Sequence, residues 1–124
     1  MQIVFIDDAV DNLKLFKIYT KALSHECHFF SNPEEGLQAL KDLEVDLCFV
    51  DIQMPGLDGK ELIKKYFDFC ETHNKKRAIS CALTGTTVDS EVEQILNAGF
   101  DRHIIKPILK KQIIELIEGI SSEQ

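Results

Sequence analysis

Short apolar runs alternate with longer segments of helical periodicity along the whole chain, and this alternation restricts the possible folds more than any other feature. The first run, Ile3–Ile6, is apolar at every position, which is typical of a strand buried on both faces of a parallel sheet. We expect five strands, at 3–6, 27–30, 45–50, 78–83 and 103–105. Strands that alternate with helices predict an α/β fold, in which right-handed crossovers place helices on both faces of one sheet.

The helical segments between these runs carry start signals. Asn32 before Pro33 predicts a helix start, because asparagine caps the first N–H groups and proline is favoured at the first helical position. Asp58 can cap the third helix in the same way. The first helix is expected over residues 11–25. Its inward side chains are expected to be Leu13, Phe16, Thr20 and Leu23.

The fourth and fifth helices have their own boundary signals. Thr87 or Asp89 can cap the fourth helix, and Gly99 is expected to end it because glycine adopts left-handed backbone angles at low cost. The fifth helix follows Pro107 and gives way to a polar tail, 121–124, that is expected to fray. The inward side chains of the fourth helix are expected to be Val92, Ile95 and Leu96.

Length and charge narrow the function classes. With 124 residues, the chain is expected to form one domain, 1–124, with its core over about 2–120. Lys and Arg number 14 against 21 Asp and Glu, and the net charge of −7 disfavours nucleic acid and anionic membranes as partners. No apolar run approaches the ~20 residues of a membrane span and no signal peptide is evident, so we expect a cytoplasmic protein. Four cysteines without a CxxC pair are expected to be reduced, small hydrophobic residues: Cys27, Cys48, Cys70 and Cys81.

Polar residues follow four of the five expected strands. Asp7 and Asp8 follow the first strand, Asp51 the third, Thr84 the fourth, and Lys106 the fifth. Ligands of open parallel sheets gather at the carboxyl ends of the strands, so these side chains are expected at one edge. The joint pattern indicates a magnesium and phosphoryl site, because a hard divalent cation relieves the repulsion between crowded carboxylates.

Each of these residues has an expected role in phosphoryl transfer, which depends mainly on positioning and charge neutralisation. Asp51 is the expected nucleophile because it ends the central buried strand. Asp7 and Asp8 would hold Mg²⁺ directly or through water. Thr84 would donate a hydrogen bond to one phosphoryl oxygen, and Lys106 would contact another as a point charge. Three carboxylates, one Mg²⁺ and one lysine sum to zero net charge.

The sequence resembles the receiver domain of two-component response regulators from Ile3 to about Ile120. The resemblance rests on four segments: 6–8 (IDD), 50–59 (VDIQMPGLDG), 83–85 (LTG), and 98–107, which begins AGFD and ends in Lys106-Pro107. It implies a flavodoxin-like fold with strand order 2-1-3-4-5. It also implies that a histidine kinase or histidine phosphotransfer protein phosphorylates Asp51. A regulatory phosphoacceptor of this kind is not an enzyme beyond its own phosphorylation from small donors and its own dephosphorylation.

The same resemblance implies a finer distribution of roles. Asp8, Asp51 and the main-chain carbonyl of Gln53 would ligate Mg²⁺ directly, with Mn²⁺ as a possible substitute, and Asp7 would act mainly through water. Thr84, followed by Gly85, matches the switch hydroxyl, and Lys106 matches the family lysine. The bond to Pro107 is often cis in the family.

Three further positions carry expectations about regulation. His103 stands where the family usually has Tyr or Phe at its aromatic switch, although an ordinary surface histidine is an equal alternative. Gln53 and Thr86 occupy positions that tune dephosphorylation in the family. Phosphorylation is expected to draw Thr84 inward and to change the partner preference of the face formed by the fourth helix, fifth strand and fifth helix.

Competing functions fit the sequence less well. A phosphatase of the haloacid-dehalogenase type would need an Asp-x-Asp motif after the first strand, whereas Asp7 and Asp8 are adjacent. A flavin or nucleotide site would need glycines or hydroxyls in that loop to cradle phosphate. A stand-alone regulator is favoured because the chain starts at Met1 and only a short tail follows the last helix. The receiver of a hybrid histidine kinase is the alternative, since the segment 8–13 is similar to such receivers.

Overall fold

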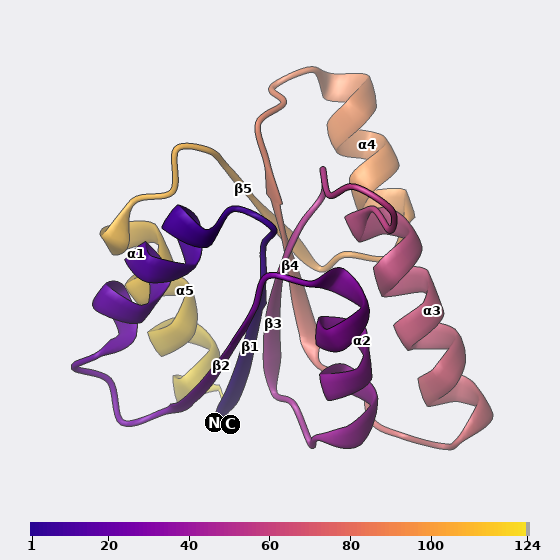
Figure 1. Cartoon of the computed structure of the whole chain (residues 1–124), viewed down its shortest axis with the longest axis horizontal. Coiled ribbons are helices and arrows are strands. Elements are labelled where there is room, and N and C mark those ends of the chain that lie inside the picture. Colours follow the sequence, from indigo (N-terminus) through magenta and orange to yellow (C-terminus); the bar gives the residue numbers. More distant parts are fainter. Residues whose placement is uncertain (124) are drawn as a thin grey trace.

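A five-stranded parallel sheet with helices on both faces forms the protein, as the computed structural model of residues 1–123 shows (Figure 1). The strand order is β2-β1-β3-β4-β5, which confirms the predicted flavodoxin-like topology. In chain order the elements are β1 (Gln2–Ile6), α1 (Val10–Thr20), β2 (Glu26–Phe30), α2 (Pro33–Asp42), β3 (Leu47–Asp51), α3 (Gly59–Thr72), β4 (Ile79–Thr84), α4 (Asp89–Asn97), β5 (Arg102–Ile105) and α5 (Lys110–Ser122).

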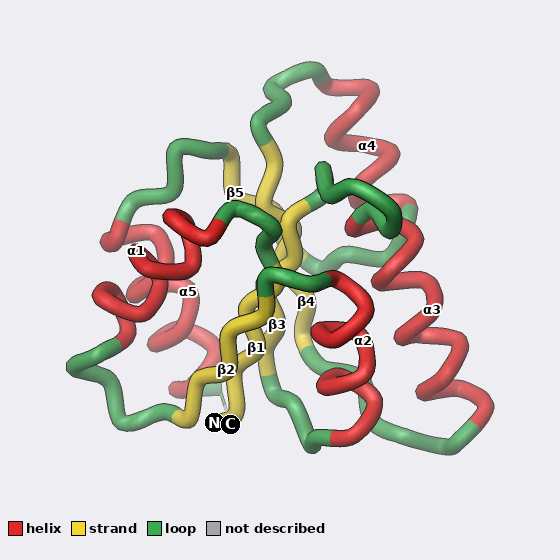
Figure 2. The backbone as a smooth tube through the Cα atoms, viewed as in Figure 1, coloured by secondary structure: helices red, strands yellow, loops and turns green. Residues whose placement is uncertain are grey.

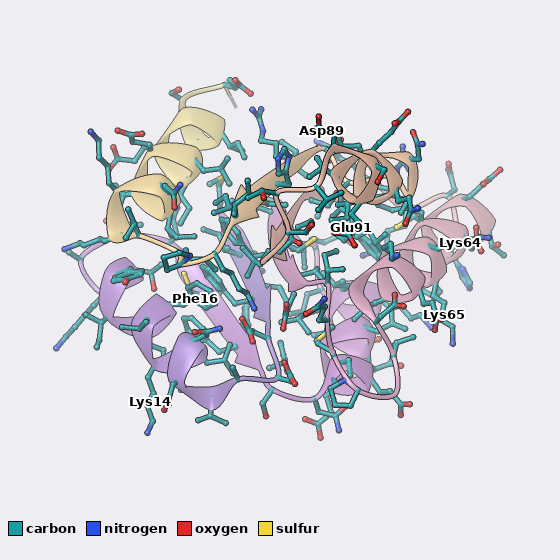
Figure 3. The ribbon with its side chains drawn as sticks, turned by 90° about the horizontal axis from the view of Figure 1, so that it is seen from above. Lys14, Phe16, Lys64, Lys65, Asp89 and Glu91 are labelled. Carbon is teal, nitrogen blue, oxygen red and sulfur yellow. The ribbon has the colours of Figure 1, made fainter. Side chains whose placement is uncertain are left out.

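The sheet separates two hydrophobic cores, because successive side chains of a strand point to opposite faces. On the face covered by α1 and α5, the ring of Phe5 stacks on Phe16, Phe29 and Phe49, with centroids 4.7–5.1 Å apart. Figure 3 shows Phe16 on the inner side of α1 and Lys14 on its outer side. On the other face, α2, α3 and α4 cover a second core (Figure 1).

Several predicted helix boundaries are confirmed by their hydrogen bonds. The Asn32 side chain accepts from the backbone N–H groups of Glu34 and Glu35 at the start of α2. The Asp58 carboxylate accepts from the backbone N–H of Glu61 at the start of α3. Gly99, with φ of +116°, follows α4 as predicted. These signals act within one helical turn, so they are readable from the sequence.

Two helix ends differ from the prediction. Helix α1 ends at Thr20, not near His25, because the backbone N–H groups of Lys21 and Leu23 turn back to carbonyls three residues earlier, in tighter turns. Helix α5 continues through Ser122, whose hydroxyl donates to the Gly119 carbonyl, so the expected fraying at 121–122 is wrong. Gln124 lies outside the described residues.

The start of α4 also differs from the prediction. Neither Thr87 nor Asp89 caps this helix, because the N-cap is Val88 and its backbone N–H donates to the Thr86 hydroxyl. Ile95 is buried as predicted, whereas Leu96 is 42% exposed. The stripe that packs inward is therefore narrower than the apolar pattern of this helix indicates.

Three cysteines, Cys48, Cys70 and Cys81, are buried in the cores as small apolar side chains, and Cys27 is half-buried. Burial raises the pKa of the Cys48 and Cys81 thiols, which keeps both protonated near neutral pH. None of the helices within residues 1–123 has the length and apolar character to cross a bilayer.

Candidate functional site

The carboxyl ends of four strands meet at one edge of the sheet, where the loops that follow them gather (Figure 2). The register explains the meeting: Ile6 pairs with Val50, Asp51 with Leu83, and Thr84 with Ile105. The residues that end these strands or follow them therefore stand side by side. Residues separated by up to about a hundred positions in the sequence are brought together by the parallel topology.

The three predicted acidic residues form one cluster at this edge. Asp7 is fully buried, Asp51 is 3% exposed, and Asp8 is exposed. Each offers a carboxylate oxygen, and these oxygens all lie within 4.8 Å of one another. Crowded carboxylates repel, so the cluster needs a compensating positive charge.

Lys106 supplies part of that charge. Its Nζ lies 3.0 Å from Asp51 Oδ1 and 3.8 Å from Asp7 Oδ2. Its backbone N–H donates to the Thr84 carbonyl at 2.7 Å, which fixes the start of the loop after β5. The following peptide bond to Pro107 is cis, as the resemblance implied. With three carboxylates and one ammonium, the site retains a formal charge of −2.

Asp51 combines burial with one unused oxygen. Lys106 and the backbone N–H of Gln53, at 3.3 Å, both donate to Oδ1, and no N–H or O–H group of residues 1–123 donates to Oδ2. Burial, and after it the neighbouring charge of Asp7, raise the pKa of Asp51 to about 6, although Lys106 lowers it. Above that pH the carboxylate is ionised and Oδ2 is available as a nucleophile.

Asp7 has protein donors on both oxygens. The Ala9 backbone N–H donates to Oδ1 at 2.9 Å, and the Asn12 side-chain amide donates to Oδ2 at 3.0 Å. Asp8 is exposed, and its carboxylate is open to solvent. The cluster thus has one fully engaged acid and two acids with oxygens to offer. This donor set fits a hard divalent cation, which takes oxygen ligands and balances the residual charge.

Thr84 and Gly85 stand beside the cluster. The Thr84 side chain is 4% exposed, and its hydroxyl oxygen accepts from the Thr86 backbone N–H at 3.1 Å. Gly85 is exposed, with no atom within 4 Å of the place where a Cβ would stand. The edge beside Thr84 therefore has room for an incoming group.

Gln53 and Thr86 face a common groove. The groove has a volume of about 470 Å³ and is also lined by Met54, Thr84 and Glu91. The Thr86 hydroxyl donates to the Glu91 carboxylate and accepts from the Val88 backbone N–H, which ties the loop after β4 to helix α4. The groove therefore borders the site on the side of Thr84.

His103 lies on β5 outside the cluster of Asp7, Asp8 and Asp51. It is half-buried on β5, two residues before Ile105, which pairs with Thr84. It lines a groove of about 520 Å³ between β5 and α5, with Arg102 and Leu116 among its neighbours. Strand alternation places His103 on the same face of the sheet as Ile105, opposite to the buried Ile104.

Two residues of the site had no role assigned to them from the sequence. Asn12 donates to Asp7, and its sequence signals are its place in the segment 8–13 and an amide side chain in the first turn of a helix that starts beside the acids. Gly59 lies against the end of β3, where a Cβ would stand 2.4 Å from the Asp51 carbonyl oxygen. Such a close approach depends on how α3 packs against β3, which the sequence alone does not define.

The site and the fold define a class of signalling domain. The family model described as "Response regulator receiver domain" matches residues 3–118. The chain therefore belongs to the receiver domain family of two-component response regulators. Receiver domains are regulatory phosphoacceptor domains and are not a family of enzymes.

Curated relatives of the chain include hybrid histidine kinases and a sensor protein. The chain is 29% identical over 118 residues to hybrid signal transduction histidine kinase F of Dictyostelium discoideum, covering 94% of this chain and 11% of the kinase. It is 24% identical over 116 residues to the sensor protein GacS of Pseudomonas syringae, covering 94% of this chain and 13% of GacS. The chain thus spans about a tenth of the length of these relatives.

Solved structures share the fold. A two-component response regulator from Clostridium difficile superimposes with a TM-score of 0.86 and 23% identity, covering 98% of this chain and 96% of that one. The receiver domain of Ssk1 from Saccharomyces cerevisiae, in complex with the histidine phosphotransfer protein Ypd1, gives 0.88 and 21%, with coverages of 94% and 86%. The receiver of the histidine kinase PA1611 from Pseudomonas aeruginosa, with magnesium in its active site cleft, gives 0.79 and 18%, with 97% of each chain covered.

Proposed function

We propose that this receiver domain accepts a phosphoryl group on Asp51 and uses it to change its protein contacts. The observation that carries the proposal is the surrounding of Asp51: a buried carboxylate with one free oxygen, an ammonium 3.0 Å away, and two further carboxylates in the same cluster. A buried acid in such a setting is suited to chemistry because its position is fixed and its charge is compensated.

The proposed reaction is an in-line displacement at phosphorus. Oδ2 of Asp51 forms the new P–O bond, and the bond from phosphorus to the donor's imidazole nitrogen, or to the acyl oxygen of a small donor, breaks with its electron pair going to the leaving group. Lys106 exchanges its contact with the carboxylate for one with a phosphoryl oxygen. The Thr84 hydroxyl donates to another phosphoryl oxygen. The product is an acyl phosphate, which water hydrolyses to restore Asp51.

Mg²⁺ is the proposed cofactor, held by Asp8, Asp51 and the main-chain carbonyl of Gln53, with Asp7 acting through water. When bound, it supplies positive charge that stabilises the oxygens of the transferred group. The magnesium in the cleft of the PA1611 receiver supports this assignment by analogy. Mn²⁺ is expected to substitute, since it accepts the same hard oxygen ligands in octahedral geometry.

The proposed phosphoryl donor is a histidine kinase or a histidine phosphotransfer protein, in line with the complex of Ypd1 with the Ssk1 receiver. A protein donor must bring its phosphohistidine to the edge where Asp51 lies. Helix α1 begins beside that edge and exposes Val10 at 55% and Ile18 at 64%. Leu109, at the start of α5, is 58% exposed. We propose that these apolar side chains are part of the donor's docking surface.

The proposed output is a change in the face formed by α4, β5 and α5. A phosphoryl group on Asp51 that accepts a hydrogen bond from Thr84 pulls on the loop that Thr86 and Glu91 tie to α4. His103 lies on β5 within the same face and is the proposed counterpart of the family's switch side chain. Gln53 and Thr86, at the approach to Asp51, are proposed to set the lifetime of the phosphoryl group. The change is a shift between existing conformations.

The last proposals concern the domain organisation of the chain and the kind of protein in which it works. We propose that residues 1–124 are one receiver domain with a core over about 2–120. A cytoplasmic, stand-alone regulator is our working proposal, and the receiver of a hybrid histidine kinase is the alternative that the curated relatives favour.

Labelling with acetyl phosphate and Mg²⁺ tests the proposed function. The wild-type protein is expected to gain one phosphoryl group, and Asp51→Asn is expected to gain none. Asp89→Asn, on the exposed first turn of α4, is the matched control and is expected to label like the wild type. Full labelling of Asp51→Asn would contradict the proposal.

A further inference from the structure

The geometry points to Asn12 as a positioning residue that holds the buried carboxylate of Asp7 and thereby sets the affinity of the acidic cluster for its divalent cation. The inference rests on the proposed function, because it assigns a role toward the proposed cofactor. The charge pattern of the strand ends does not include this residue, which lies within the segment 8–13 that resembles hybrid-kinase receivers.

Asp7 is held on both sides by neutral donors. It is fully buried, and its two oxygens accept from the Ala9 backbone N–H at 2.9 Å and the Asn12 amide at 3.0 Å. Asn12 stands in the first turn of α1, only five residues after Asp7, so a single turn of chain closes this contact. The orientation of the buried carboxylate is therefore fixed before any cation arrives, and a fixed ligand shell binds more tightly than a mobile one.

The Asn12 amide also affects how the Lys106 ammonium is divided between Asp7 and Asp51. Asp7 Oδ2 lies 3.0 Å from the Asn12 amide and 3.8 Å from Lys106 Nζ, whereas Lys106 lies 3.0 Å from Asp51. The amide fills the position on Oδ2 that the ammonium would otherwise take. Without it, the negative charge of buried Asp7 attracts Lys106 more strongly and draws it away from Asp51.

The chemical type of the side chain fits this role. Asparagine donates a hydrogen bond without adding charge, so it satisfies Asp7 and leaves the residual charge of −2 for the cation. An alanine at this position would leave one oxygen of a fully buried carboxylate without its donor. A glutamine would keep an amide donor on a side chain one methylene longer.

Calorimetric titration of the protein with MgCl₂, without any phosphoryl donor, tests the inference. Asn12→Ala is expected to raise the dissociation constant for Mg²⁺ about tenfold or more, as is typical when a residue behind a metal ligand is removed. Asn12→Gln is expected to restore part of the affinity. Asn97→Ala, at the exposed end of α4, is the control and is expected to bind like the wild type.

A second readout separates this role from a general loss of structure. Alanine is a better helix former than asparagine, so α1 is retained and the circular dichroism of metal-free Asn12→Ala is expected to match the wild type. Wild-type Mg²⁺ affinity in Asn12→Ala would overturn the inference while leaving the proposed function intact. A wild-type protein that binds no Mg²⁺ would instead contradict the proposed function itself.

Discussion

The burial that favours the reactivity of Asp51 also destabilises the folded protein when this carboxylate is ionised. It is buried beside a second buried acid, and its pKa is raised to about 6 from an ordinary value of 3.8. A carboxyl group with a raised pKa in the folded state disfavours folding when it is ionised, at a pH above about 6. That cost shrinks as the pH falls from about 6 and disappears below 3.8, where the carboxyl is protonated in both the folded and the unfolded states.

Asp51→Asn is therefore expected to stabilise the metal-free protein at neutral pH. Asparagine carries no charge, so the gain in the free energy of unfolding is expected to be about 1–3 kcal/mol at about pH 7.5 and to fall to about a third of that at about pH 4.5. Urea denaturation at both pH values, with chelator present, measures it. Asp89→Asn corrects for the titration of other groups, and an equal gain at both pH values would contradict the assignment of the pKa.

Lys106→Met removes the charge that compensates two buried acids. We expect it to lower the free energy of unfolding of the metal-free protein by about 1–2 kcal/mol at neutral pH, a value reduced because the lysine is partly exposed. Lys111→Met is the matched control, since its pair with Glu115 is exposed and 3.8 Å long. Thermal unfolding of both variants decides the point: equal losses would mean that the Lys106 pair contributes no more than a surface pair.

At the scale of the elements, Gly59 links helix α3 to the end of β3. A Cβ at this position would lie 2.4 Å from the Asp51 carbonyl oxygen and 2.9 Å from the Ile52 Cα. Both contacts are with backbone, which cannot rotate away as a side chain can. The first residue of α3 therefore controls how closely the helix approaches the strand that ends in the proposed phosphoacceptor.

Gly59→Ala is expected to destabilise the fold by about 1–3 kcal/mol through overpacking and to slow labelling of Asp51 by acetyl phosphate. Gly119→Ala provides a contrast of opposite sign. Gly119 lies within α5 with open space around its Cα, so alanine is expected to stabilise by about 0.5–1 kcal/mol. Chemical denaturation of the two variants gives the comparison, and a neutral Gly59→Ala would contradict the close approach.

The sequence predicts some helix boundaries better than others. A boundary is predictable when the hydrogen bond that fixes it joins residues a few positions apart within the same helix. Asn32 and Asp58 cap their own helices within three residues, so both starts were predicted correctly. The start of α4 depends on Thr86, which accepts from Val88 and donates to Glu91 across a loop, so the predicted caps were wrong. Leu96 completes an apolar stripe in the sequence, yet the structure leaves it exposed.

At the scale of the whole molecule, the parallel sheet assembles the site. The residues after the strands were predictable because each strand ends in a change from apolar to polar residues, and a parallel sheet brings those ends together. The α/β class follows from the sequence pattern, whereas the strand order came from the family resemblance. The contact of Asn12 with Asp7 depends on how the loop after β1 turns into α1, and the approach of Gly59 depends on how α3 packs against β3; residue types alone define neither.

The most direct test of the central claim is chemical mapping of the phosphorylated residue. After incubation with acetyl phosphate and Mg²⁺, borohydride reduces an aspartyl phosphate to homoserine, and mass spectrometry of the peptides locates the change. Homoserine is expected at position 51 and at no other position, and none is expected when a chelator is present during the incubation. Homoserine at position 7 or 8 in place of position 51, or the same product with chelator present, would contradict Asp51 as the Mg²⁺-dependent phosphoacceptor.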